Sequence, residues 1–246
     1  MPIELGQSGF YEWQDHPFWR QPDPPGAGLG VRSDRIGEFV DHFVSGGFEG
    51  IFGHKGFGFE QADLNFLRRT PQAKWLWFWD SKLNDIEAIY ELNELKYAGI
   101  NDKRPGIDFS RLPALSMCVN HWNARDTGFE GSLIETYILW RCNPRDKSCE
   151  KVGIPRNVRS LELNWANPGS LAGFPVLNAL KRIEFHYCRN LHDLSELPRI
   201  APNLEALVVS HCRKCDSGAG VVDHPSLLNA FVNGRVVIDR RGHATG

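Results

Sequence analysis

The sequence predicts an α/β solenoid, in which short parallel strands stack side by side and are joined by helical turns. Three observations support this fold class. One nine-residue pattern occurs six times: apolar, two variable residues, apolar, one variable, apolar, two variable, then a small or amide residue. Successive copies lie 20 to 24 residues apart. Between the copies, apolar residues recur at every third position, which is typical of a short helix or 3₁₀ turn.

Each copy of the pattern is expected to form one strand. Side chains alternate along a strand, so the two central apolar residues face the core and the residues beside them face solvent. The six copies are Leu92/Leu95/Tyr97/Ile100, Leu112/Leu115/Met117/Asn120, Ile134/Tyr137/Leu139/Cys142, Val158/Leu161/Leu163/Ala166, Leu180/Ile183/Phe185/Cys188 and Leu204/Leu207/Val209/Cys212. A degenerate copy at Gln72/Trp75/Trp77/Asp80 and a weaker one at Phe48/Ile51/Gly53 come before them, and Arg235–Asp239 is expected to be the closing strand.

The segments between the strands form the outer limb of each repeat. Its expected apolar positions are Leu83, Ile86, Ile89 and Leu92, and later Leu191, Leu194 and Leu197. Two longer helices are predicted outside the repeats. One begins at Ser33 as N-cap and runs to about Val44, with Ile36, Phe39, Val40 and Phe43 on one face. The other covers Pro225–Asn233.

The two ends of the chain are expected to cap the solenoid, because an end repeat otherwise exposes its core. Residues 1–47 form the N-terminal cap, which includes the aromatic-rich segment Phe10–Trp19, the Pro/Gly-rich segment Gln21–Gly30 and one helix. Residues 48–215 hold about seven to eight repeats. Residues 216–246 form the C-terminal cap, with its helix and closing strand.

With this repeat pattern the chain resembles the leucine-rich repeat superfamily, over roughly residues 48–212 and most clearly over 83–212. The segment from Leu197 to Leu207, LPRIAPNLEAL, is typical of that family. Aromatic residues replace several leucines, and the asparagine of the family pattern survives only at Asn120. The resemblance implies a horseshoe, with a parallel sheet on the concave face and short helices or 3₁₀ turns on the convex face. It also implies a binding function.

Composition restricts the class of partner and the compartment. The chain has 246 residues, 41% of them hydrophobic, and a net charge of −2, whereas nucleic-acid binders show a clustered basic face. The N-terminus has no basic start and no apolar run, so we expect no secretory signal. No apolar stretch approaches the roughly 20 residues that span a bilayer. We therefore expect a cytoplasmic protein with no membrane or nucleic-acid partner, and with reduced cysteines.

A cluster of cysteine and histidine residues suggests a zinc site as an alternative. Cys212 and Cys215 have CxxC spacing, His211 precedes them, and His186 and Cys188 lie one repeat earlier. The repeat pattern instead assigns Cys142, Cys188 and Cys212 to its ninth position, where a small side chain packs beneath the backbone. We expect structural cysteines and neither metal nor cofactor.

Catalysis is the third class of function considered. A nucleophile would need a base within hydrogen-bond reach, and Ser210 and Cys118 are the only outward candidates, of which Cys118 lies three repeats from His186. The glycine-rich segment Gly50–Gly58 lacks the phosphate-loop pattern, so we expect it to join an early strand to its outer limb. We expect a protein that is not an enzyme, with an enzyme or zinc protein using residues 186–215 as the alternative.

The outward strand positions, together with the eighth position of each repeat, give a candidate partner-binding surface. Exposed aromatic residues and arginine are frequent interface anchors, and mixed charge suits the rim around them. The predicted surface contains Leu76, Phe78, Trp79, Glu94, Lys96, Ile138, Trp140, Arg141, Glu162, Trp165, Arg182, Glu184, His186, Tyr187 and His211. The alternative is that the N-terminal cap or a long loop covers the large apolar groups, chiefly Leu76 and Phe78 and less so Trp140 and Trp165, because the N-terminal segment is itself rich in aromatic residues.

The expected partner is another protein, bound by a chain that is monomeric by itself. Small single-unit repeat proteins of this kind resemble the immunity proteins that bacteria pair with toxins. That resemblance implies toxin neutralisation by docking over the toxin's active site. An intracellular adaptor or scaffold is the alternative within the binding class.

Overall fold

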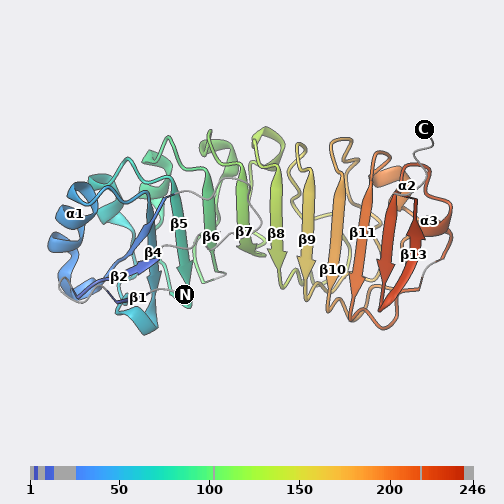
Figure 1. The fold of residues 1–246 in the computed structure, drawn as a ribbon, viewed down its shortest axis with the longest axis horizontal. Coiled ribbons are helices and arrows are strands. Elements are labelled where there is room, and N and C mark those ends of the chain that lie inside the picture. Colours follow the sequence, from blue (N-terminus) through green and yellow to red (C-terminus); the bar gives the residue numbers. More distant parts are fainter. Residues whose placement is uncertain (1–2, 5–8, 14–25, 102, 217, 241–246) are drawn as a thin grey trace. The chain divides into compact units, whose positions relative to one another are not determined.

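The computed structural model describes residues 3–4, 9–13, 26–101, 103–216 and 218–240. The chain divides into two compact units, Met1–Gly106 with Arg111–Ser116, and Ile107–Ser110 with Met117–Gly246. In each unit the strands lie side by side in sequence order, and most neighbours are parallel (Figure 1). The prediction of a solenoid-like α/β chain, with a mostly parallel sheet and short helical turns, is confirmed at this level.

The first unit combines parallel strands with a short antiparallel start. Strands β1, β2 and β3 pair antiparallel, and β3 to β6 pair parallel. The described strands are β1 (Ile3–Glu4), β2 (Tyr11–Trp13), β3 (Gly28–Gly30), β4 (Gly50–His54), β5 (Trp75–Trp79) and β6 (Tyr97–Ile100). Helix α1 (Ile36–Ser45) buries Phe39, Val40 and Phe43, as predicted for that segment.

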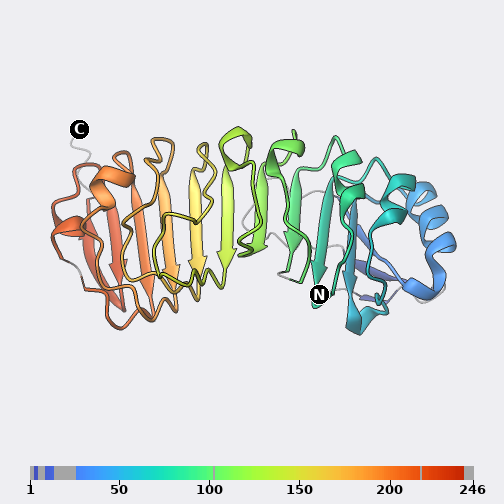
Figure 2. The ribbon, with the colours of Figure 1, turned by 180° about the vertical axis from the view of Figure 1, so that it is seen from behind.

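The second unit is more regular. Strands β7 to β12 are parallel where their pairing is described, and β13 closes the sheet antiparallel to β12. The strands are β7 (Met117–His121), β8 (Thr136–Trp140), β9 (Ser160–Asn164), β10 (Arg182–His186), β11 (Ala206–Ser210), β12 (Asn229–Val232) and β13 (Arg235–Asp239). The short helices α2 (Leu197–Ile200) and α3 (Ala219–Val222) belong to the connections. Seen from behind, the connections between β8 and β11 cross one face of the sheet (Figure 2).

The outer limbs begin with a recurrent side-chain turn. Oδ1 of Asp63, Asp85 and Asp193 each accepts the backbone N–H two residues ahead, at 2.8–2.9 Å. The apolar residues that follow at every third position pack into the core. Leu83, Ile86, Ile89 and Leu92 are buried, as are Leu191, Leu194 and Leu197, which confirms the expected outer limbs.

The predicted repeat frame is confirmed from β8 to β11. Tyr137 pairs with Leu161, Leu161 with Ile183, and Ile183 with Leu207, so the intervals of 24, 22 and 24 residues are those of the strand register. All four of these side chains are at most 1% exposed.

The predicted frame is wrong in the earlier copies. Leu76 is the inward residue that pairs with Ala98, and Cys118 is the inward residue that pairs with Tyr137. The first inward strand residue is therefore Ala98 rather than Leu95, and Cys118 rather than Leu115, three residues later than predicted. On β5 it is Leu76 rather than Trp75, one residue later. The three-residue apolar period of the outer limb continues into the strand, through Leu92 and Leu95 to Ala98, so two frames satisfy the pattern equally well.

Two predicted helical features also need correction. Ser33 does not cap a helix: it begins a 3₁₀ turn, and its Oγ accepts the N–H groups of Glu60 and Gln61 at 2.8 and 3.0 Å. Pro225–Asn233 is not a helix, because Asn229–Val232 forms β12 beside β11. The closing strand at Arg235–Asp239 is confirmed as β13. The predicted cap residues 14–25 lie outside the described residues.

Candidate partner-binding surface

The second unit presents one sheet face away from the outer limbs, and we call it the open face. Side chains alternate between buried and partly exposed along β8 and over the first four residues of β9, so the strand frame identifies the outward set. The open face of β8 to β11 carries Thr136, Ile138, Trp140, Ser160, Glu162, Asn164, Arg182, Glu184, His186, Ala206, Val208 and Ser210. The predicted residues Ile138, Trp140, Glu162, Arg182, Glu184 and His186 are therefore brought together on this face.

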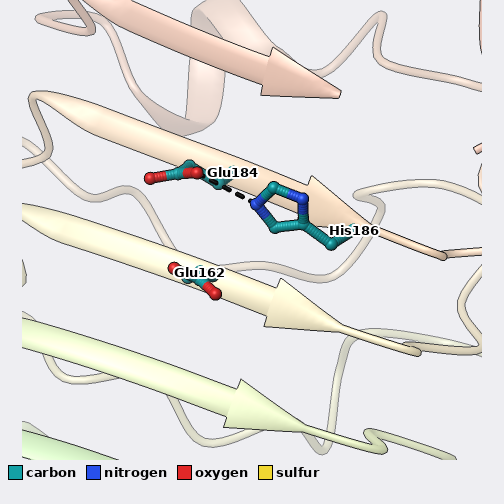
Figure 3. Close-up of side chains that lie close together, drawn as sticks. All are labelled: Glu162, Glu184 and His186. Atoms are coloured by element: carbon teal, nitrogen blue, oxygen red, sulfur yellow. Dashed lines mark hydrogen bonds and ion pairs between the residues drawn. The ribbon is translucent and has the colours of Figure 1, made fainter. Parts of the chain in front are cut away.

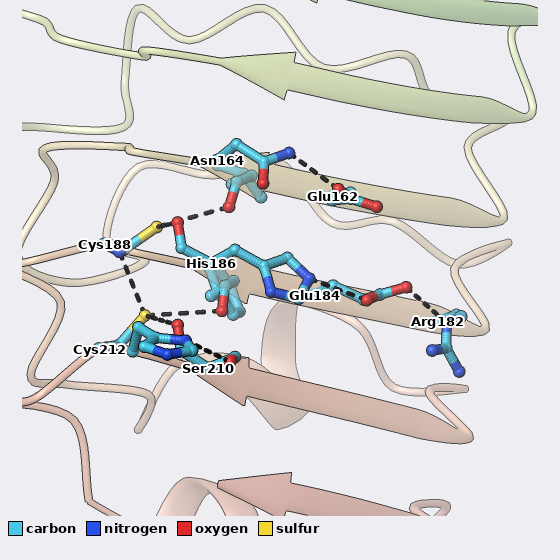
Figure 4. Close-up of polar contacts among 11 residues, drawn as sticks. Glu162, Asn164, Arg182, Glu184, His186, Cys188, Ser210 and Cys212 are labelled. Carbon is cyan, nitrogen blue, oxygen red and sulfur yellow. Dashed lines mark hydrogen bonds and ion pairs between the residues drawn. The ribbon is translucent and has the colours of Figure 1, made fainter. Parts of the chain in front are cut away.

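A charged network lies near the middle of the open face. Glu184 is only 3% exposed, and its two carboxylate oxygens accept from Nε of Arg182 at 2.8 Å and from Nε2 of His186 at 2.9 Å (Figure 4). Glu162 occupies the paired position on β9 and accepts from Nδ2 of Asn164 at 2.8 Å. A carboxylate buried without partners costs several kcal/mol, of the order of 3–5 kcal/mol, and Arg182 and His186 supply the hydrogen-bond partners that Glu184 needs at this position.

Three side chains of this network form the group of described residues that could hold a metal ion. Glu162, Glu184 and His186 each offer one ligand atom, and these atoms lie within 4.8 Å of one another (Figure 3). Carboxylate oxygen and imidazole nitrogen are common ligands of zinc. The hydrogen bond from Arg182 already occupies one oxygen of Glu184, and a bound cation would have to displace His186 from the other.

A row of rings, stacked or tilted against one another, borders the open face at the carboxyl ends of the strands. We call it the aromatic ridge, made of His121, Trp140, Trp165, Tyr187 and His211. Centroid distances between successive rings are 6.4, 5.1, 4.8 and 4.5 Å. Trp165 and Tyr187 are 43% and 41% exposed. Apolar rings of this size at a solvent-exposed position are frequent protein-binding anchors.

The backbone holds the ridge in an unusual conformation. Arg141, Trp165, Tyr187 and His211 follow the strands directly and have left-handed φ values of 55°, 51°, 58° and 58°. The N–H groups of Arg141, Trp165 and Tyr187 donate to the last residue of the next strand at 2.8–2.9 Å. The parallel hydrogen-bond ladder thus continues one residue past these strands, which holds Trp165 and Tyr187 at equivalent positions of successive repeats.

Leu76 and Phe78 were expected to face solvent, and that expectation is wrong. Both are 0% exposed, and Phe78 packs against Phe59 with ring centroids 5.1 Å apart. Trp75, Trp77 and Trp79 take the opposite face of β5 instead. Trp13 of the N-terminal strand β2 packs edge-on against Trp75 and Trp77, at 6.4 and 6.2 Å. Trp79 is half-buried on this face and stacks on Trp77.

Glu94 and Lys96 do not lie on a strand as predicted. Both are exposed, but they precede β6, where the N–H of Lys96 donates to the carbonyl of Lys74 at 2.8 Å. The error arises because the inward strand residue is Ala98 and not Leu95, so the strand lies three residues further along the chain than predicted. It also places Cys118 in the core, 2% exposed, so Cys118 is not the outward nucleophile candidate that the sequence suggested.

The cysteines of the ninth position are core residues, as the repeat frame predicts. Cys142, Cys188 and Cys212 are at most 1% exposed, and the N–H of Cys188 donates to Sγ of Cys212 at 3.2 Å. Burial raises the pKa of the Cys142 thiol to about 12. Cys215 is also buried, and burial raises its thiol pKa to about 12. Among the described residues, the donor group that could hold a metal includes none of these cysteines.

The sequence frame missed one row of this surface, the tenth repeat position. Asn143, Asn167 and Arg189 occupy it, beside the ridge. Nδ2 of Asn167 donates to Oδ1 of Asn143 at 2.7 Å, and Nδ2 of Asn190 donates to Oδ1 of Asn167. The recurrence of amide residues one position after the repeat pattern was the signal that could have revealed this row.

Comparison with known proteins adds no family assignment. No protein-family model matches the chain, and no curated protein matches it. Among the described residues, no helix combines the length and the apolar character that crossing a bilayer requires.

Proposed function

We propose that this chain is a cytoplasmic leucine-rich repeat protein that binds another protein through its open face, as the concave side of a horseshoe. The main support for this proposal is the aromatic ridge, in which Trp165 and Tyr187 are more than two-fifths exposed. Beside it lie the acidic, basic and histidine side chains of Glu162, Arg182, Glu184 and His186. This arrangement combines aromatic anchors with a polar surround, which is the composition of protein-binding hot spots.

The partner that we propose is a cognate bacterial toxin, which the protein neutralises by covering the toxin's active site. The rigid ridge supports this role because pre-organised aromatic groups lose little conformational entropy on binding. An adaptor that merely recruits a partner would use the same surface, so the two roles differ in whether binding abolishes the partner's activity.

The test uses the toxin encoded beside the gene as the binding partner. Trp140→Ala and Trp165→Ala should each weaken the complex by about 2 kcal/mol or more, roughly 30-fold in Kd, measured by isothermal titration calorimetry. Val176→Ala is the matched control, because Val176 is 41% exposed but lies between β9 and β10, away from the ridge. The wild-type chain should also inhibit the toxin at one-to-one stoichiometry.

Two results would count against the proposal. Unchanged affinity in a folded Trp140→Ala or Trp165→Ala variant would remove the ridge from the interface. Tight binding without inhibition of the toxin would favour the adaptor role over neutralisation.

A further inference from the structure

An open groove lies beside the aromatic ridge at the carboxyl ends of β8 to β10. Its volume is about 570 Å³, and Trp140, Trp165 and Tyr187 form one wall. Tyr187 stacks on Trp165, and Trp140 packs against Trp165 at a tilt of 31°, so neighbouring rings contact one another along this wall. Such a wall is apolar, rigid and continuous over three repeats.

The rest of the groove offers positive charge and hydrogen-bond donors. Arg141 and Arg189 line it, both are exposed, and neither makes an ion pair or a side-chain hydrogen bond with any residue that the structure describes. Asn143 ends the amide row, and its oxygen accepts from Asn167, which leaves its Nδ2 group to donate. No aspartate or glutamate is among the lining residues. The groove therefore suits an anionic occupant.

The backbone conformation after the strands also points to a functional role for the residues that line the groove. The equivalent left-handed positions after β5 and β12 carry Asp80 and Asn233, residue types that adopt this conformation readily. The β8 to β10 repeats place Arg141, Trp165 and Tyr187 there instead, at a conformational cost of the order of 1–3 kcal/mol each. Strained backbone of this kind is concentrated at functional sites, and here three of the strained residues, Arg141, Trp165 and Tyr187, line the groove.

We propose that this groove binds an acidic, extended segment of the partner protein, whose carboxylates pair with Arg141 and Arg189. This inference rests on the proposed function, since it names the chemistry of the segment that the partner contributes. Planar guanidinium groups bind carboxylates in a bidentate manner. Arg141 follows β8 and Arg189 follows β10, two strands or about 10 Å away, a span of about three residues in an extended segment.

Ring geometry and charge favour a peptide over a nucleic acid as the occupant. Single-stranded nucleic acids bind by stacking bases on open ring faces. In the ridge Tyr187 stacks on Trp165 with centroids 4.8 Å apart, and the tilted ring of Trp140 lies 5.1 Å from it, so neighbouring rings compete with a base for the faces of Trp165. The chain's net charge of −2 also opposes long polyanions, whereas a short acidic segment meets only the local positive groove.

The experiment measures fluorescence anisotropy of three labelled probes with the full chain: hexaglutamate, hexalysine and hexathymidylate. Hexaglutamate should bind, more weakly as salt rises, and the double variant Arg141→Ala/Arg189→Ala should weaken it at least tenfold. Arg159→Ala is the matched control, because Arg159 is also exposed but precedes β9 at the opposite end of the strand. It should leave hexaglutamate binding unchanged.

The alternatives give different outcomes. Hexaglutamate binding that is absent, or equal in wild type and double variant, overturns the inference, as does equal binding of hexalysine. Preferential binding of hexathymidylate, lost in the double variant, would assign the groove to a nucleic acid. Toxin binding that is lost in Trp140→Ala but unaffected in the arginine double variant would leave the proposed function standing and remove only the acidic-segment inference.

Discussion

At the residue scale, the open face holds an acidic side chain, Glu184, that is almost fully buried and has hydrogen-bond partners for its carboxylate. Glu184 is the most buried acidic side chain of the site, and both its oxygens accept hydrogen bonds, one from Arg182 and one from His186. Its neighbour at the same height on β8, Ile138, is apolar, so the charged network is confined to β9 and β10. With such partners available, the same position of successive strands can carry an apolar side chain, as in Ile138, or an acidic one, as in Glu184.

His224 shows the opposite solution for a buried titratable group, and it makes a pH-dependent prediction. It is 0% exposed, Nε2 has no hydrogen-bond partner among the described residues, and burial lowers its pKa below the ordinary 6.5. The folded state therefore binds this proton less readily than the unfolded state. Stability that is fully present above pH 6.5 should be lost as the pH falls below that value.

The measurement is urea unfolding of wild type and His224→Phe between pH 8 and pH 5. The phenyl ring keeps the planar shape and cannot be protonated, so the variant should lose less stability on acidification than wild type. Parallel pH curves for the two proteins would show that His224 does not carry this dependence.

At the scale of the element, aromatic rings in the first unit lie against glycines on neighbouring strands. Gly28 and Gly50 lie where a Cβ atom would enter the ring of Trp75, and Gly99 lies in the same relation to Trp77. Glycine weakens a strand because it has no side chain to pack, and a cross-strand aromatic ring restores that packing. The three glycines and two tryptophans thus make one flat, continuous face.

Gly50→Ala tests this packing directly. Trp75 is 0% exposed and its Nε1 donates to the carbonyl of Gly26 at 2.9 Å, so the ring cannot move aside without losing that bond. The substitution should cost about 2–3 kcal/mol of unfolding free energy, measured by chemical denaturation. Gly37→Ala is the control: it lies in α1 with nothing within 4 Å of the added carbon, and should stabilise by about 0.5–1 kcal/mol. A Gly50→Ala variant as stable as wild type would show that Trp75 is free to shift.

At the scale of the whole molecule, the repeat pattern predicted the architecture far better than it predicted individual surfaces. From Ile134 onward, the alternation of large apolar and polar residues admits a single frame, and the open face follows from it. Before Ile134, apolar residues at every third position admit two frames, and only the strand pairing of Leu76 with Ala98 decides between them. The ridge itself depends on left-handed backbone at Trp165 and Tyr187, which no spacing rule encodes.

A destabilising substitution in the second unit should destabilise the nearest repeats most, because in a solenoid each repeat contacts mainly its neighbours. The end of the unit offers a clean test. Ile238 of β13 pairs with Ala230 and is 7% exposed, whereas Val236 on the same strand is 70% exposed. Ile238→Asp places a charge against the core, while Val236→Asp places the same charge in solvent.

Hydrogen exchange followed by mass spectrometry should then show a graded effect along the strands. In Ile238→Asp, amides of β12 and β13 should lose protection first, β11 less, and β8 and β9 should keep wild-type protection. Val236→Asp should match wild type throughout. Uniform loss of protection from β8 to β13 would mean that the unit unfolds as one cooperative block, in which the terminal hairpin stabilises every repeat rather than its nearest neighbours alone.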